Sequence, residues 1–275
     1  MISSLLKRRA YSGGPHFDRL TSLCFDLESI DLELTIPASD FDMAESPRML
    51  KLPFNNPGWF ETHSKRRGVH DYVNLFTEMW GYFPAGLPRM FNLMGMGSNQ
   101  RMGELSLGLH LNKLKGDRKL ASGNPRSLGD YIKWEYEDHY ESPKVGDGGK
   151  GKNYEVRLRE DLLLAQRGES YRSQYEIALC TELEPIPHHF DLLDFGGNVW
   201  TCFRLDRGWT RSSKFYCIPL SDSYYLRLDI RLLFEVSDKN RRILEPDMLS
   251  AAEWLVQHVK ITFPGKPSGP LALPH

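Results

Sequence analysis

Apolar and polar residues alternate along several segments of the chain. A period of two is typical of a strand that has one face on a core and one polar face, because successive side chains point to opposite sides. The polar positions carry both charge signs, so favourable pairs between neighbouring strands are expected there. The segments predicted as strands are residues 32–36, 105–111, 154–158, 175–179, 199–205, 215–220, 226–232 and 260–263.

Three other segments have the spacing of an amphipathic helix. Apolar residues recur every three or four positions in residues 69–80, which places them on one helical face. The same pattern predicts a second helix at residues 128–140 and a third at residues 246–259. Pro246 then lies in the first turn of the third helix, where its missing N–H costs no helical hydrogen bond.

The order of these elements predicts the fold class. Runs of consecutive strands flanked by helices favour an α+β fold with a mainly antiparallel sheet over a doubly wound parallel sheet. We expect a single α+β domain at residues 20–263, with the alternative that residues 20–100 elaborate a core at residues 101–263. Residues 1–19 are predicted as a basic N-terminal arm, and the Pro/Gly-rich residues 264–275 as a flexible tail.

The charge balance narrows the classes of partner. The 35 lysine and arginine residues face 36 aspartate and glutamate residues, which gives a net charge of −1. A near-neutral chain has no overall attraction for nucleic acid or for an anionic membrane, so we expect neither as a partner. No stretch approaches the length needed to span a bilayer. A charge near zero does little to oppose association, which favours a protein partner.

The N-terminal segment and the cysteines bear on the cellular compartment. Residues 3–12 are basic, hydroxylated and free of acids, but they lack the apolar run of a secretory signal. We therefore expect a cytoplasmic protein, with a mitochondrial presequence at residues 1–12 as the alternative. The cysteines are widely spaced and form no CxxC pair, so we expect buried reduced thiols, not metal ligands or disulfides. They are Cys24, Cys180, Cys202 and Cys217.

Motifs for catalysis are missing from the sequence. It contains no GxSxG, no SxxK and no cysteine with a signature around it, and no two acids form a recognisable acid/base pair by their spacing. The glycine-rich residues 95–99 precede a predicted strand, whereas a phosphate-binding loop follows a strand and opens a helix. The basic residues 65–67 are interpreted as a solvated turn. We predict no catalytic residues and no cofactor.

Adjacent histidines form the densest group of potential metal ligands. His188 and His189 stand beside Asp191 and Asp194 in a segment that prolines mark as a loop. Neighbouring side chains on an extended chain diverge, and the i, i+4 spacing of a helical metal pair is missing. We therefore predict no metal site, and we keep a metal-dependent enzyme built on this loop as an alternative.

Aromatic and arginine residues gather between the predicted elements. Such residues on loops resemble the side chains that dominate binding between proteins. The other interpretation is that they cap the core. The candidate partner-binding residues are Trp59, Phe60, Tyr82, Phe83, Arg207, Trp209 and Arg211.

The C-terminal part of the chain resembles a known fold family. Residues 219–236 (PLSDSYYLRLDIRLLFEV) and 245–263 (EPDMLSAAEWLVQHVKITF) are similar to the long strand, acidic-started helix and short last strand of PsbP/DcrB-like α+β sandwiches. Residues 127–140 (SLGDYIKWEYEDHY) resemble a helix of the same domains. The resemblance covers residues 100–263 and implies a non-enzymatic module with an accessory, chaperone-like or inhibitory role.

One bacterial group within this family is especially similar. Residues 24–37 (CFDLESIDLELTIP) resemble the opening of immunity proteins that are paired with type VI secretion lipase effectors. The resemblance implies a protein that neutralises a cognate secreted toxin by steric occlusion of its active cleft. Many such proteins carry export signals; since none is recognised here, we expect action in the cytoplasm. A secretion adaptor or chaperone and a mitochondrial accessory protein are the alternatives.

Overall fold

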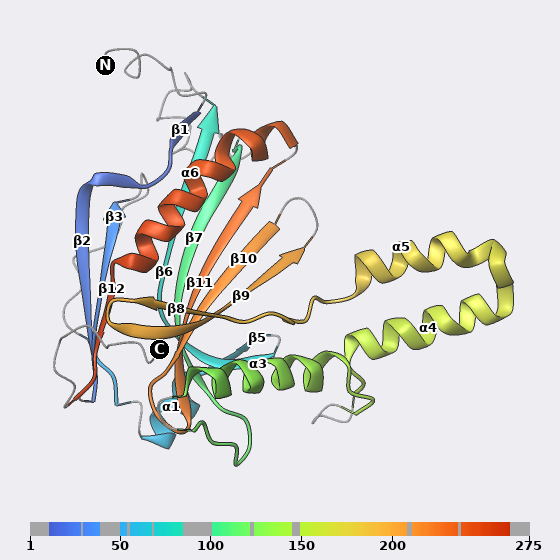
Figure 1. The fold of residues 1–275 in the computed structure, drawn as a ribbon, viewed down its shortest axis with the longest axis horizontal. Helices are drawn as coiled ribbons and strands as arrows, with labels where there is room; N and C mark the ends of the chain where they lie inside the picture. Colours follow the sequence, from blue (N-terminus) through green and yellow to red (C-terminus); the bar gives the residue numbers. More distant parts are fainter. Residues whose placement is uncertain are drawn as a thin grey trace, which may run out of the picture.

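In the computed structural model, the described residues form two mainly antiparallel sheets, long helices that pack on the larger sheet, and a pair of helices that projects away from the sheets (Figure 1). No helix in the described part of the chain combines the length and apolar character that crossing a bilayer requires. The structure describes residues 11–28, 30–38, 50–53, 56–67, 69–84, 101–121, 124–144, 149–207, 211–235 and 238–264.

The larger sheet has eight strands, and every neighbouring pair is antiparallel. The alternating pattern correctly predicted its central strands, although β7, β9 and β11 extend beyond the predicted segments. In pairing order the strands are β1 (Tyr11–Gly13), β6 (His70–Pro84), β7 (Gly103–Lys113), β11 (Tyr224–Phe234), β10 (Arg211–Pro219), β9 (Asn198–Arg207) and β8 (Asp191–Phe195), with β5 (Lys65–Arg67) pairing beside β6.

The smaller sheet has four strands and contains the predicted strand at residues 32–36 and the predicted short last strand. The pairing between β2 and β4 is parallel, and its other pairs are antiparallel. The predicted α+β class with a mainly antiparallel sheet is confirmed. In pairing order the strands are β12 (Val259–Thr262), β3 (Ile30–Ala38), β2 (His16–Leu27) and β4 (Leu50–Lys51).

Helices lie on both faces of the larger sheet. The long helix α6 (Asp238–Gln257) contacts β7 and β11 on one face, where it shares a continuous apolar core with the smaller sheet (Figure 1). Helix α3 (Pro125–Tyr140) contacts β9 and β10 and belongs to a second apolar cluster. The short helix α1 (Pro57–His63) begins at Asn56, whose side chain accepts the backbone N–H groups of Gly58 and Trp59.

Two of the three predicted helices are present. Helix α3 confirms the prediction at residues 128–140. Helix α6 includes residues 246–257 but begins at Asp238, so the prediction that Pro246 lies in the first turn is wrong. Leu244 and Met248 are both fully buried, and this i, i+4 pair continues the apolar face across the proline. Packing of that face stabilises the extra turns.

The third predicted helix, at residues 69–80, is wrong, because this segment is the long strand β6. Its pairing with β7 shifts register between Asn74 and Phe76, which is a β-bulge. Val73 before the bulge and Trp80 after it both belong to the main core, although one position is odd and the other even. The extra residue changes the parity of the apolar positions and produces spacings of three that imitate a helix.

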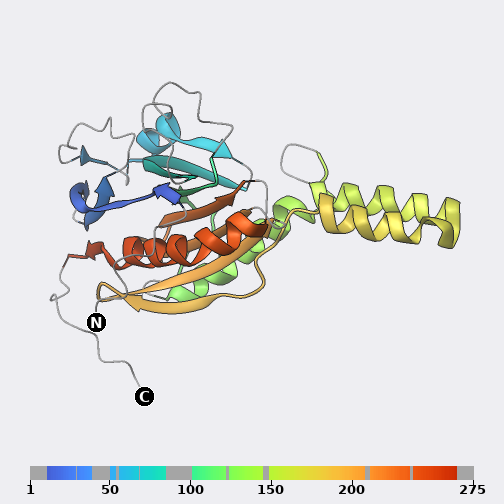
Figure 2. The same ribbon diagram turned by 90° about the horizontal axis from the view of Figure 1, so that it is seen from above.

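The predicted strands at residues 154–158 and 175–179 are also wrong. These segments lie in helix α4 (Lys152–Arg167) and helix α5 (Arg172–Glu182), which are joined by the 3-10 turn η2 (Gly168–Tyr171). The two helices run side by side and project away from the sheets (Figures 1 and 2). We call residues 152–182 the helical arm. Leucine, glutamate, arginine, alanine and glutamine, all good helix formers, dominate α4 and outweigh a short alternation.

Other segments differ in smaller ways from the sequence interpretation. Residues 191–195, expected in a loop, form the edge strand β8, and the basic residues 65–67 form β5 instead of a turn. Residues 11–13 and 16–19 of the predicted N-terminal arm lie in strands. The glycine-rich residues 95–99 lie outside the described residues, as does most of the predicted tail.

Candidate functional site

The face of the larger sheet that α3 partly covers carries a group of buried charged side chains. Alternation along β11 sends Leu226, Leu228 and Leu232 into the main core and sends Arg227 and Asp229 to the opposite face. Arg227 is only 5% exposed and Asp229 only 1% exposed. Charges with so little access to water are costly unless they are paired, so their surroundings identify the site to be explained.

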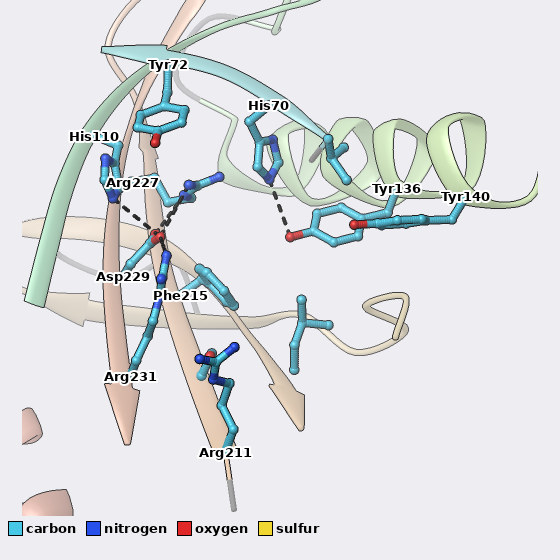
Figure 3. Close-up of a pocket in the computed structure, with 13 residues that line it drawn as sticks. His70, Tyr72, His110, Tyr136, Tyr140, Arg211, Phe215, Arg227, Asp229 and Arg231 are labelled. Carbon is cyan, nitrogen blue, oxygen red and sulfur yellow. Dashed lines mark hydrogen bonds and ion pairs between the residues drawn. The ribbon is translucent and has the colours of Figure 1, made fainter. Parts of the chain in front are cut away.

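A cavity of about 190 Å³ lies beside these two residues (Figure 3). Strands β6, β7, β9, β10 and β11 and helix α3 contribute to its wall, because the antiparallel register brings these strand positions onto one face. We call it the charged cavity. It is lined by Val69, His70, Tyr72, His110, Tyr136, Tyr140, Leu205, Arg211, Ser213, Phe215, Arg227, Asp229 and Arg231.

Asp229 is the centre of the charged network. Arg227 donates to its two carboxylate oxygens from Nε at 2.7 Å and from Nη2 at 3.2 Å, a bidentate pair. Arg231 donates from Nη2 at 3.1 Å, and His110 Nε2 lies 3.5 Å from Oδ2 (Figure 3). Burial alone would raise the pKa of Asp229, but Arg227, His110 and Arg231 together outweigh it and hold the pKa below its usual value. Asp229 is therefore a carboxylate.

His110 is held in a neutral form beside this network. Burial lowers its pKa to about 4, and the charge of Arg227 acts in the same direction, against the attraction of Asp229. Its ring lies over Gly108, where an added Cβ would approach His110 Nε2 to 2.6 Å. Tyr72 packs against the ring in an edge-on contact, with centroids 4.8 Å apart. Gly108 is thus a structural requirement of the site.

A second chain of hydrogen bonds joins β6 to α3. His70 Nδ1 lies 2.8 Å from Glu135 Oε2, and His70 Nε2 lies 3.4 Å from the hydroxyl of Tyr136. Burial lowers the pKa of His70 and raises that of Tyr136, so the imidazole is neutral and the phenol is protonated. With Glu135 as a carboxylate, His70 donates from Nδ1 and accepts from Tyr136 at Nε2. This arrangement fixes the Tyr136 ring at the cavity wall.

Positive charge exceeds negative charge in the cavity wall. Three arginines, Arg211, Arg227 and Arg231, line it together with one carboxylate, Asp229. Nη1 of Arg227 is buried and has no hydrogen-bond partner in the described part of the structure. The cavity therefore offers donors and uncompensated positive charge. The described wall contains the hydroxyl of Ser213 and no cysteine thiol. With its excess of arginine, the arrangement is suited to holding an anion.

A larger and more apolar cavity lies at the other end of β9 and β10. Its volume is about 500 Å³, and α3 contributes its first residues to the wall. It has no charged lining residue except Arg126. The lining residues are Leu120, Asn124, Pro125, Arg126, Leu192, Asn198, Val199, Ile218, Pro219, Leu220, Ser221, Phe263 and Pro264.

The two ends of the helical arm are joined by hydrogen bonds, and the arm carries exposed apolar side chains. Asn153, only 1% exposed, anchors its base by donating to the Glu184 carbonyl at 2.9 Å and accepting the Glu184 N–H at 2.7 Å. Arg159 pairs with Glu182 across the two helices at 2.7 Å. The exposed apolar residues of the arm are Leu158, Leu162 and Ile177, at 40%, 56% and 63% exposure.

The residues predicted to bind a partner do not form one cluster. Phe60, Tyr82 and Phe83 are buried and Trp59 is half-buried, with Phe60 and Tyr82 inside the main core. Their burial agrees with the other interpretation of the sequence, in which these aromatic side chains cap the core. Arg211 is exposed and lines the charged cavity.

Two further predicted residues contribute less. Arg207 ends β9 opposite Arg211, and nothing is described of its side chain. Trp209 lies outside the described residues. Partner binding by any of the seven residues stays a prediction.

The cysteines and the adjacent histidines are also placed by the structure. All four cysteines are free; Cys202 and Cys217 are buried as predicted, whereas Cys24 and Cys180 are exposed, so the prediction of burial is wrong for these two. His188 and His189 are exposed. Across the described residues, no three His, Cys, Asp or Glu side chains are grouped so as to hold a metal ion.

The charged cavity was not predicted from the sequence. Arg227, Asp229 and Arg231 appeared only as the polar half of an alternating strand. Their burial depends on α3 and on strands that come from distant parts of the chain. The available signal was the sequence LRLDIRLL itself, because alternating charges of both signs on a long central strand require partners on the adjacent strands.

Comparisons with known proteins add little to these observations. No protein-family model matches the chain, and no curated protein sequence matches it. Among solved structures, the chain is similar to LpqN, described as involved in cell envelope biogenesis of Mycobacterium tuberculosis. The TM-score is 0.28 at 9% identity, over 70% of this chain and 85% of that one. This likeness carries no argument about function.

Proposed function

We propose that the protein is a non-enzymatic protein-binding module and that the helical arm is its recognition element. The observation that carries this proposal is the arm itself, a pair of helices that projects from the body (Figure 2) and carries exposed apolar side chains. Exposed leucine and isoleucine gathered on a structure held away from the core can bury their apolar area only against another surface. An amphipathic helix is a common element for insertion into the groove of a partner.

The orientation of the leucines on α4 supports this role. Val156 and Glu160 are buried within the arm, whereas Leu158 and Leu162 are exposed. Positions two residues apart on a helix point about 200° apart, so the two leucines form a stripe on the side away from these buried residues. This stripe is one turn long and is available to a partner without any change in the arm.

The identity of the partner is proposed from the sequence resemblance alone. We propose a cognate secreted effector of the lipase type, neutralised in the bacterial cytoplasm when the arm occludes its active cleft. Steric occlusion needs a protruding element, and the Asn153 anchor with the ion pair between Arg159 and Glu182 joins the two helices of the arm. Exposed charges around the stripe would set the choice of partner.

Co-purification with the product of the adjacent gene tests the proposal. The variant Leu158→Asp, Leu162→Asp, Ile177→Asp places charge on the stripe and at the exposed Ile177 of α5, and we expect it to lose the complex and the protection of cells against that product. The matched control is Gln166→Asp, Ser173→Asp, Gln174→Asp, which adds the same charge at exposed polar positions of the arm. Circular dichroism confirms that both remain folded. Complex formation and protection by the first variant at the level of the control would contradict the proposal.

A further inference from the structure

We propose that the charged cavity binds the carboxylate group of a small organic acid. This inference goes beyond the proposed function, because the cavity lies on the sheet face and the stripe on the helical arm. It rests on three observations: the excess of arginine over carboxylate in the wall, the unpartnered nitrogen of Arg227, and the aromatic side chains opposite.

The first step concerns the guanidinium of Arg227 and the one nitrogen of it that Asp229 does not contact. Nε and Nη2 are used by Asp229, and Nη1 is buried without a partner in the described part of the chain. Figure 3 shows the guanidinium between Asp229 on one side and the His70–Tyr136 pair on the other. A buried charged donor without a partner is strongly unfavourable, and an oxyanion in the cavity would satisfy it.

The second step concerns access to the cavity. Exposure increases from Arg227 at the floor, through the side chain of Arg231 at 34%, to Arg211, which is exposed. Arg231 shares Asp229 with Arg227 through one Nη2 contact at 3.1 Å. Among the described residues, Arg211 has no carboxylate within ion-pair distance. An anion that enters past Arg211 therefore meets two further arginines and decreasing access to water.

The third step concerns the class of anion. The cavity volume of about 190 Å³ exceeds the roughly 150 Å³ that accommodates a benzene molecule. Phe215, Tyr136 and Tyr140 form an aromatic side of the wall, and the Arg227 guanidinium lies 5.7 Å from the Phe215 ring centre. A second cavity of about 320 Å³ adjoins it, and both are lined by Tyr72, His110, Arg211 and Arg231. An organic body attached to a carboxylate fits this wall better than a bare inorganic anion does.

Calorimetric titration of the full chain at pH 7 tests this proposal. The probes are sodium benzoate, sodium isovalerate, benzyl alcohol as the neutral analogue of benzoate, and sodium phosphate, all at the same ionic strength. We expect a carboxylate to bind with a stoichiometry of one, and benzyl alcohol and phosphate to bind at least about tenfold more weakly, since a charge-assisted pair is lost or the aromatic contact is missing.

Variants at the mouth of the cavity locate the binding. Arg211→Gln and Arg231→Gln alter exposed or half-exposed side chains, so they are expected to fold and to weaken carboxylate binding about tenfold each. Arg204→Gln is the matched control, because Arg204 neighbours Leu205 on β9 and points to the opposite face. Failure of both carboxylates to bind would overturn the proposal, as would equal binding of phosphate or benzyl alcohol, or equal weakening by Arg204→Gln. None of these outcomes bears on the helical arm.

Discussion

The two faces of strand β11 are buried to a similar degree and are chemically opposite. On one face Leu226, Leu228 and Leu232 are at most 2% exposed and pack in the apolar core beneath α6. On the other face Arg227 and Asp229 are at most 5% exposed, and they lie against the charged cavity. One strand thus supports the hydrophobic core with alternate residues and a polar site with the residues between them.

The two faces contribute to the molecule in different ways. Burial of a leucine side chain stabilises the fold by about 1.5 to 3 kcal/mol. A buried ion pair stabilises far less, because the loss of hydration offsets the attraction, and an apolar pair of similar volume is often as stable. The apolar face therefore accounts for stability. The charged face is better explained by binding than by folding.

Loss of the central carboxylate should produce the largest effect. Asp229→Ala leaves Arg227 buried without its bidentate partner, and we expect a loss of about 3 to 5 kcal/mol in the free energy of unfolding. The double variant Arg227→Met, Asp229→Leu removes both charges and should recover most of that loss. Urea unfolding measures both. A loss below about 1 kcal/mol for Asp229→Ala would mean that water screens the pair and that the charged face is not buried.

A deletion on the apolar face is the direct counterpart. Leu228 is fully buried beside the positions of Arg227 and Asp229, and Leu228→Ala should cost about 3 kcal/mol through lost burial and the cavity that remains. This loss should be the same at low and high salt, because no charge is removed. A salt-dependent loss would show that the two faces are not energetically separate.

Acid should destabilise the folded protein through two buried histidines. The pKa of His110 is about 4 in the folded protein, below its ordinary value of 6.5, so the unfolded chain binds more protons between these pH values. Stability should therefore fall by about 2 kcal/mol as the pH falls from 6.5 to 4.5, and His70, whose pKa is also lowered, adds to the fall.

Urea unfolding at several pH values measures this dependence. His110→Gln should reduce the dependence of stability on pH. His189→Gln should not, because His189 is exposed and does not line the cavity. A stability that stays constant from pH 6.5 to 5 would contradict the assigned environment of His110.

The smallest effect on stability is expected at the cavity mouth. The Arg231 side chain is 34% exposed and shares Asp229 with Arg227, so Arg231→Gln should cost less than about 1 kcal/mol. The same substitution should weaken carboxylate binding. A stability loss comparable to that of Asp229→Ala would show that Arg231 supports the fold and not the site.

The fold was predictable where periodicity was long and regular. The alternation of residues 226–232 and 105–111 identified the central strands, and the apolar stripe of residues 246–257 identified α6. The prediction failed at β6 because one bulge residue changed the parity of the pattern. It failed in the helical arm because two five-residue alternations lie in segments where helix propensity decides.

The candidate site was less predictable than the fold. His70, His110, Glu135 and Asp229 are far apart in the sequence, and the strand register together with α3 brings them into one network. No rule on sequence spacing predicts contacts between residues that lie so far apart in the chain. The predicted aromatic residues that the structure describes do not line the charged cavity, and two of them, Phe60 and Tyr82, complete the core.

A pH titration of His110 by NMR tests the central claim, that the second face of the sheet encloses a buried charged cluster. The full-length protein is titrated, and His110→Gln assigns the resonance. We expect the neutral form to persist well below pH 6, with a pKa of about 4. A pKa near the ordinary value of 6.5 would contradict the account, because it would place His110, and with it Asp229, in contact with water.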